Sequence, residues 1–157
     1  MNEFALARRL AEVLETDPEL SAWIGSKYPG RPFSTYLGMD NRVPPGESAC
    51  PFAILFPDGK TAGDGVAEKE HVILMRLAVA NGAVTKSGSR TSYAGIEDIT
   101  SFADLAVAAI ARNVFSLGLD WFRFEREFDH VNYFPMFVAD FRFVFVQHVS
   151  VTDNQYD

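Results

Sequence analysis

The chain is poor in the residues that most often build reactive or cross-linked sites. Its 157 residues include one cysteine, Cys50, so an intramolecular disulfide is excluded. The three histidines are far apart in sequence, and Cys50 alone does not complete a zinc-type ligand set. No run approaches the roughly 18 consecutive apolar residues that a membrane-spanning helix requires. These absences predict no disulfide framework, no metal site and no membrane span.

Basic charge is scarce as well. Lys and Arg number 14 against 21 Asp and Glu, which gives a formal net charge of -7. Because proteins that wrap nucleic acid need clustered cations, this balance argues against a nucleic-acid-binding surface. Charged residues also interrupt residues 1–14, so we predict no signal peptide and synthesis in the cytoplasm. The length predicts a single domain over residues 1–157, with a frayed polar tail at 152–157.

Motifs that carry chemistry are incomplete. Residues 58–61 (Asp-Gly-Lys-Thr) resemble part of a phosphate-binding loop, but the leading glycine spacing is missing. Glu125, Glu127 and Asp129 alternate along one predicted strand face, a pattern compatible with acid–base chemistry. Arg123 shares that face, so a charged strip towards solvent or another subunit is the favoured interpretation. We therefore predict no catalytic, cofactor-binding or metal-binding residues, and a protein that is not an enzyme.

Phenylalanine is the residue that the chain has in excess, and it is concentrated near the C-terminus. Nine of the 14 Phe residues lie between Phe115 and Phe145. Residues 121–131 and 134–149 are predicted to form a β-hairpin with a turn at 132–133. A period-two pattern places several Phe residues of each arm on one face, which predicts an apolar face: Phe122, Phe124 and Phe128 in the first arm, and Phe137, Phe141, Phe143 and Phe145 in the second. Since an isolated hairpin is not stable in water, this one requires other strands, helices or subunits to cover it.

Apolar periodicity and turn residues predict the remaining elements. Helices are expected at 2–16, 18–24 and 96–113, and an edge strand at 33–37. Further strands are expected at 51–57 and 70–80, the latter central because both of its faces are apolar. Glycine and proline predict an extended connection at 26–50 and flexible loops at 57–69 and 81–93. The predicted fold class is α+β: a mainly antiparallel β-sheet with two helices packed on one face, plus extended loops.

Charged residues inside apolar strands are candidates for contacts between subunits. Arg76 and Arg142 each interrupt such a strand, and Asp140 lies two residues from Arg142 on the same face. These arginines pair either with carboxylates inside the domain or with charges on a neighbouring subunit. Adding the cations of the 81–93 loop and one Phe of the hairpin gives the candidate interface Arg76, Lys86, Arg90, Phe141 and Arg142.

Several segments together resemble the tail-terminator proteins of long-tailed bacteriophages, the minor tail protein U-like and tail-completion families. The N-terminal helix runs into Thr-Asp-Pro-Glu-Leu at 16–20 and Trp-Ile-Gly at 23–25. A proline-rich connection then leads to Cys-Pro-Phe-Ala-Ile-Leu at 50–55. The strand at 72–79, the helix at 96–113 and the closing strand pair complete the pattern, which covers nearly the whole chain.

The resemblance implies a specific structural role. Proteins of this kind are small α+β subunits that form a hexameric ring on the last ring of tail-tube protein. The ring stops tube polymerisation and presents a surface to the head–tail connector protein, and DNA passes through it without sequence-specific binding. The implied location is the head–tail junction of the virion. The family has no catalytic residues or cofactors to carry over.

Four other interpretations stay open. The first is a head-completion or neck protein of the same junction. The second is a tail-tube subunit, although a tube would require more strands than are predicted. A small-ligand-binding or hydrolytic α+β domain would use the Phe-lined sheet as a pocket wall, but it needs a convergent polar cluster. A standalone dimer would bury the hairpin against its own copy.

Overall fold

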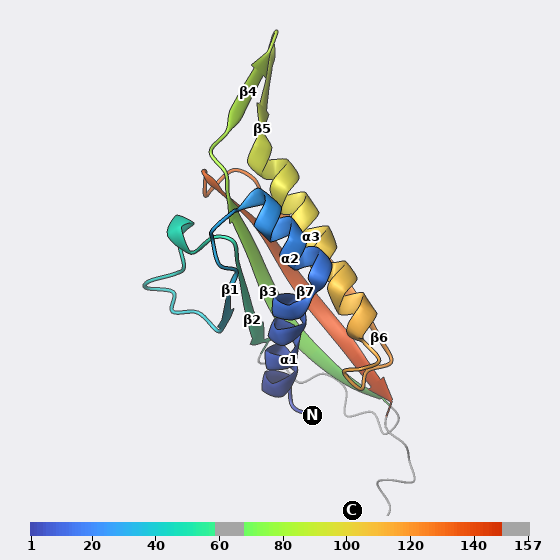
Figure 1. The fold of residues 1–157 in the computed structure, drawn as a ribbon. Helices are drawn as coiled ribbons and strands as arrows, with labels where there is room; N and C mark the ends of the chain where they lie inside the picture. The colour runs from blue at the N-terminus through green and yellow to red at the C-terminus, as the bar shows by residue number, and fades with distance from the viewer. Residues whose placement is uncertain (59–67, 149–157) are drawn as a thin grey trace, which may run out of the picture.

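The computed structural model describes residues 1–58 and 68–148. Within these ranges, three α-helices cover one face of a five-stranded sheet, called the main sheet below, and a separate two-stranded hairpin projects from one end (Figure 1). In chain order the elements are α1 (Glu3–Thr16), α2 (Pro18–Lys27), β1 (Ser34–Leu37), the short helix η1 (Glu47–Ala49), β2 (Phe52–Pro57), β3 (Glu68–Ala80), β4 (Val84–Ser87), β5 (Arg90–Tyr93), α3 (Ala94–Asn113), β6 (Trp121–Asp129) and β7 (Met136–His148).

The main sheet has the strand order β1-β2-β3-β7-β6. The two longest strands, β3 and β7, are antiparallel and pair along their whole length, from Glu68↔His148 to Ala80↔Met136. β2 and β6 flank them, also antiparallel. The α+β class and the central position of β3 are therefore confirmed.

One edge of the sheet departs from the predicted antiparallel pattern. β1 pairs with β2 in parallel, so the sheet is mixed. Residues 38–51 connect the two strands, which is too long for a tight turn and long enough to return the chain to the start of β1. Strand direction at this edge is set by that connection, which local sequence patterns do not specify.

All three helices lie on the same side of the sheet, whereas the predicted fold class had two helices packed on one face (Figure 1). α2 continues through Gly25 to Lys27 and packs beside α3 on the same side of the sheet (Figure 1). Asp17 separates α1 from α2 and caps the second helix by accepting a 2.9 Å hydrogen bond from the Leu20 amide. Asp17 also accepts a 2.6 Å hydrogen bond from Arg112 at the end of α3, which ties all three helices together.

The main core lies between the helices and the sheet. The predicted Phe face of β7 is confirmed, because Phe137, Phe141, Phe143 and Phe145 are all at most 3% exposed. Gly95 in α3 allows one of these close approaches, since a Cβ at this position would lie 2.1 Å from the Phe137 ring. Phe141 belongs to this core. Its side chain is therefore covered within the chain, and its place at a subunit interface stays a prediction.

The segment at 81–93 is a hairpin rather than a loop. β4 and β5 pair from Val84↔Tyr93 to Ser87↔Arg90, joined by the two-residue turn Gly88-Ser89. Gly88 has φ +63°, the left-handed conformation that glycine adopts at the first turn position of a type II′ hairpin. Every strand residue of this hairpin is exposed. The hairpin stands clear of the main sheet (Figure 1).

The turn of the C-terminal hairpin is longer than predicted. The connection between β6 and β7 runs over residues 130–135, longer than the predicted turn at 132–133, and Asp129 accepts hydrogen bonds from the Val131 and Asn132 amides within it. Most of the predicted 57–69 loop and the whole predicted frayed tail at 152–157 lie outside the described residues.

Replacement of Phe141 by alanine tests its assignment to the core. We expect Phe141→Ala to lower the free energy of unfolding by about 3–5 kcal/mol, because it leaves a cavity between β7 and the helices. Phe124→Ala is the matched control, since Phe124 lies on the same face but is 39% exposed and should give a smaller loss. Urea denaturation measures both. Unchanged stability in Phe141→Ala would contradict the core assignment.

The link between Asp17 and Arg112 predicts a loss of stability in acid. Burial alone would raise the pKa of Asp17, but hydrogen bonds from Arg112 and the Leu20 amide hold it below the ordinary value of 3.8. A lowered folded-state pKa contributes stability at pH values above 3.8, and this contribution is lost as the pH falls through the folded-state pKa.

Asp17→Asn keeps a capping side chain but removes the ionisable group. At neutral pH we expect it to lower the free energy of unfolding by about 1 kcal/mol, a modest value because Arg112 is partly exposed. Urea midpoints measured at neutral pH and in acid should show the difference from the wild type shrinking in acid. A difference that does not depend on pH would contradict the lowered pKa.

Candidate functional site

The surface of the main sheet opposite the helices, called the open face here, carries the polar residues that interrupt the strands. Side chains alternate along each strand, so the neighbours of the core residues point to this side. Residues 38–50 cover one end of it, where Phe52, Ile54, Ala78 and Val138 form a second buried cluster with Cys50. The rest of the open face combines partly exposed apolar side chains with charged ones.

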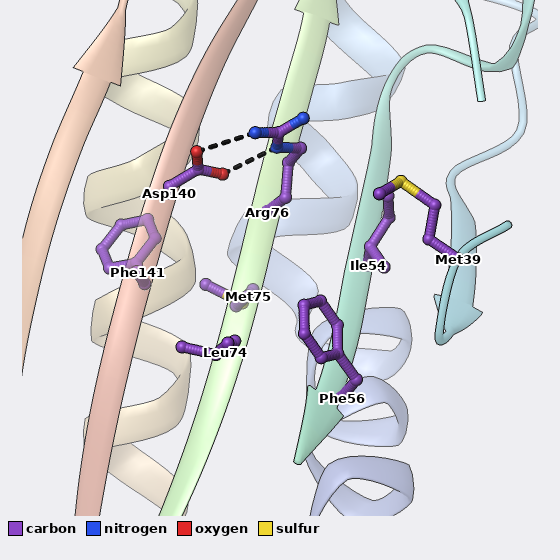
Figure 2. A pocket seen from close by; sticks show the side chains of 8 residues that line it. All are labelled: Met39, Ile54, Phe56, Leu74, Met75, Arg76, Asp140 and Phe141. Atoms are coloured by element: carbon purple, nitrogen blue, oxygen red, sulfur yellow. Dashed lines mark hydrogen bonds and ion pairs between the residues drawn. The ribbon is translucent and has the colours of Figure 1, made fainter. Parts of the chain in front are cut away.

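An ion pair between neighbouring central strands lies in the middle of the open face. Arg76 of β3 and Asp140 of β7 are partners in register, and the guanidinium donates two hydrogen bonds of 2.7 and 2.9 Å to the carboxylate (Figure 2). The bond to Asp140 raises the pKa of Arg76 above its ordinary value. Arg76 was expected to pair either with a carboxylate inside the domain or with a charge on a neighbouring subunit. The structure shows the first kind of pair, with Asp140.

Arg142 also has a carboxylate partner inside the chain. Its Nε lies 3.7 Å from Asp58 Oδ2, just beyond the end of β2. The Arg142 side chain is 43% exposed, so this contact is weaker than the Arg76–Asp140 pair and leaves the guanidinium accessible. Whether either arginine also meets a neighbouring subunit stays a prediction.

Two adjoining depressions form a groove across the open face. The first has a volume of about 280 Å3 and is lined by Met39, Ile54, Phe56, Leu74, Met75, Arg76, Asp140 and Phe141 (Figure 2). The second has about 460 Å3 and is lined by Leu74, Glu125, Arg126, Glu127, Asp140, Phe141 and Arg142. They share Leu74, Asp140 and Phe141, so we treat them together as the open-face groove. Its β2 side is apolar and its β6 side carries carboxylates.

The other two predicted interface residues lie elsewhere. Lys86 and Arg90 are on the β4–β5 hairpin and are exposed. The structure therefore does not bring them together with Arg76 and Arg142 in one copy of the chain. The sequence prediction placed them in a flexible loop, although Gly-Ser is a recognised two-residue hairpin turn and was the available signal.

A patch of exposed apolar side chains lies at the base of the hairpin. The exposed fractions are 44% for Val84, 43% for Tyr93, 81% for Val131 and 52% for Phe134. With His130 they line a hollow of about 500 Å3. The Tyr93 and Phe134 rings meet edge to face with centroids 5.9 Å apart, which joins the hairpin base to the β6–β7 connection.

Two further titratable side chains, His71 and Cys50, are buried within the fold. His71 is fully buried and lies 3.2 Å from Glu3 and 3.1 Å from Gln147, linking α1, β3 and β7, a role that sequence reasoning did not assign. Burial raises the pKa of the Cys50 thiol to about 12, so the thiol stays protonated at neutral pH. Within residues 1–58 and 68–148, no three His, Cys, Asp or Glu side chains gather as metal ligands.

Neither family models nor curated proteins give a match to this chain. In the part of the chain that the structure describes, no helix has the length and apolarity to cross a membrane.

A double-mutant cycle measures how strongly Arg76 and Asp140 are coupled. We expect Arg76→Met to destabilise the fold, because it leaves Asp140 opposite Glu127 in register without its cation. Asp140→Asn should recover part of that loss in the double variant. A coupling energy of about 0.5–1 kcal/mol is expected, since both side chains are partly exposed. Strictly additive effects in urea denaturation would contradict the coupling.

Proposed function

We propose that the protein is a structural assembly subunit, and specifically a tail-terminator protein of a long-tailed phage. In this role, copies form a ring that caps the tail tube, stops its polymerisation and provides the surface for joining the head. The observation that carries the proposal is the projecting β4–β5 hairpin, whose strand residues are all exposed. A two-stranded ribbon is marginally stable alone, so an arm of this kind gains stability from contact with another molecule.

Exposed apolar surface gives further support. Val131 is 81% exposed and Phe134 is 52% exposed at the base of the arm, and the open-face groove carries partly buried apolar side chains. Contiguous apolar surface that is rimmed by polar residues is typical of protein–protein contact sites. The chain thus presents at least two surfaces suited to partners.

The sequence resemblance to tail-terminator proteins is the reason for proposing the phage tail as the assembly. Its implied partners are further copies of the chain, the tail-tube protein and the head–tail connector protein, at the head–tail junction of the virion. The net charge of -7 suits a ring through which DNA passes, because like charge discourages adhesion to phosphates.

The native mass and tube binding of the purified protein test this function. Light scattering after size exclusion, over a concentration series and with negative-stain imaging, should reveal rings of about six subunits alone or on added tail tubes. A chain that neither forms rings nor binds tail tubes would contradict the terminator role. Binding to the connector without binding to tubes would instead identify a head-completion protein.

Deletion of Thr85–Arg90 tests the arm directly. The deletion leaves Val84 and Tyr93, which are partners in register, joined by a two-residue turn. Because the arm lies outside both buried clusters, the circular dichroism spectrum and the urea midpoint should be nearly unchanged, while tail joining is lost. Glu12→Ala, on the exposed side of α1, is the control and should join tails normally. A normal virion yield from the deletion variant would contradict a role of the β4–β5 hairpin in tail joining.

A further inference from the structure

The β4–β5 hairpin is a cationic segment in an acidic chain. Lys86 and Arg90 are its charged residues, and residues 81–96 contain no Asp or Glu, whereas the whole chain carries -7. The strand register places Val84, Lys86, Thr91 and Tyr93 on one face of the ribbon. Arg90 lies on the other face with polar neighbours. One face of the arm is therefore amphipathic, with apolar side chains at the base and one cation near the tip.

The open-face groove has the complementary character. Its β2 side offers the partly exposed Phe56 beside the buried Ile54, and the partly exposed Leu74 lies in its floor. On its β6 side Glu125 and Glu127 are exposed and form no ion pair with any described residue. Their neighbours on β7, Arg142 and Asp140, already pair with Asp58 and Arg76.

Three arginines and three carboxylates line the groove, but Arg126 and Arg142 pair with Asp104 and Asp58, which do not line it. Glu127 lies opposite Asp140 in register, so two carboxylates share one row of the same face. Arg76 neutralises Asp140, and Arg142, opposite Glu125, pairs with Asp58. A cation from outside would therefore lower the repulsion in this row, and an ammonium group at the tip of an arm can supply it.

The dimensions of the two surfaces also agree. The groove crosses from β2 to β6, three strand spacings or about 14 Å. Each strand of the arm has four residues, about 13 Å at the usual rise per residue. On the amphipathic face of the arm Val84 and Lys86 are two residues apart, about 7 Å at the usual rise, so the Lys86 side chain has to extend along the groove to reach the carboxylates.

The arm's own groove is out of its reach. In Figure 1 the hairpin extends beyond the end of the main sheet and away from the middle of the strands that form the groove. Contact between an arm and a groove therefore involves two copies and two different surface patches. Such a heterologous contact repeats head to tail and closes into a ring when the rotation allows.

We propose that the Val84–Lys86–Thr91–Tyr93 face of the arm of one copy docks in the open-face groove of the next, with Lys86 between Glu125 and Glu127. The proposal rests on the assembly role proposed above and deepens it by naming both surfaces of the subunit contact. Its occupant is a second copy of this chain.

Charge exchange tests the pairing. Lys86→Glu should weaken self-association about tenfold, because it places another carboxylate between Glu125 and Glu127. Combining it with Glu127→Lys in the same chain should recover most of the loss. Arg90→Glu is the matched control: it makes the same charge change on the opposite face of the arm and should have a clearly smaller effect. Sedimentation over a concentration series measures association, and circular dichroism confirms the fold.

Disulfide trapping tests the contact without requiring stable association. Chains with Thr91→Cys are mixed with chains carrying Leu74→Cys and oxidised, alone and with tail tubes. The mixture should give cross-linked pairs, whereas Ser92→Cys, on the other face of the arm, should give few with Leu74→Cys. Absence of a Thr91–Leu74 cross-link in every condition overturns the proposal, as does an equal yield from Ser92→Cys.

The outcomes separate this contact from the proposed function. Closed rings or capped tubes without the specific cross-link overturn the arm-in-groove contact and leave the terminator role standing. The specific cross-link in a protein that binds no tail tube supports the contact and removes the terminator role. Equal effects of Lys86→Glu and Arg90→Glu count against the assigned face of the arm.

Discussion

The pairing of β3 with β7 is the constraint on which the rest of the structure depends. The two strands are bonded along their whole length, from Glu68↔His148 to Ala80↔Met136. Because side chains alternate, a slip of one residue would turn the Phe face of β7 towards the open side and carry Asp140 under the helices. Burial of Phe137, Phe143 and Phe145 therefore fixes the register. The same register aligns Arg76 with Asp140 and leaves their ion pair on the open face.

The two faces of the main sheet have different roles because the chain covers them unequally. α1 and α3 close one face with leucine, isoleucine and phenylalanine, and the Asp17–Arg112 bond holds the helices to each other. On the other face, residues 38–50 cover one end, and Leu74 and Phe56 remain partly exposed. The fold does not need the open-face groove for its main core, so the groove is free to bind.

Much of this arrangement follows from periodicity in the sequence. Alternating Phe predicts the buried face of β7, apolar residues on both faces predict a central β3, and helical spacing predicts α1 and α3. The parallel direction of β1 was not predictable in this way, because it depends on where a long connection returns. The β4–β5 hairpin was missed because its strands bury nothing and so lack an apolar pattern, which leaves Gly88-Ser89 as the signal.

The placement of individual side chains needs information that local patterns do not hold. Whether Arg76 pairs inside the chain or outside it depends on the register of two strands that are far apart in sequence. Phe141 lies on the same face of β7 as the other Phe residues of that strand. The sequence pattern predicts this face, but it does not indicate whether helices or another subunit cover it. In the structure the helices cover this face.

An exposed ribbon with two free edges carries a risk of aggregation, since unpaired strand edges invite indiscriminate pairing. The composition of the arm reduces that hazard. Lys86 and Arg90 place charge near the tip, the remaining strand residues are mostly serine and threonine, and the apolar Val84 and Tyr93 lie at the base. A purely polar arm would have little affinity for any partner, and a purely apolar one would aggregate. An amphipathic arm that requires both an apolar floor and a carboxylate at a set distance is selective, and the open-face groove meets both requirements.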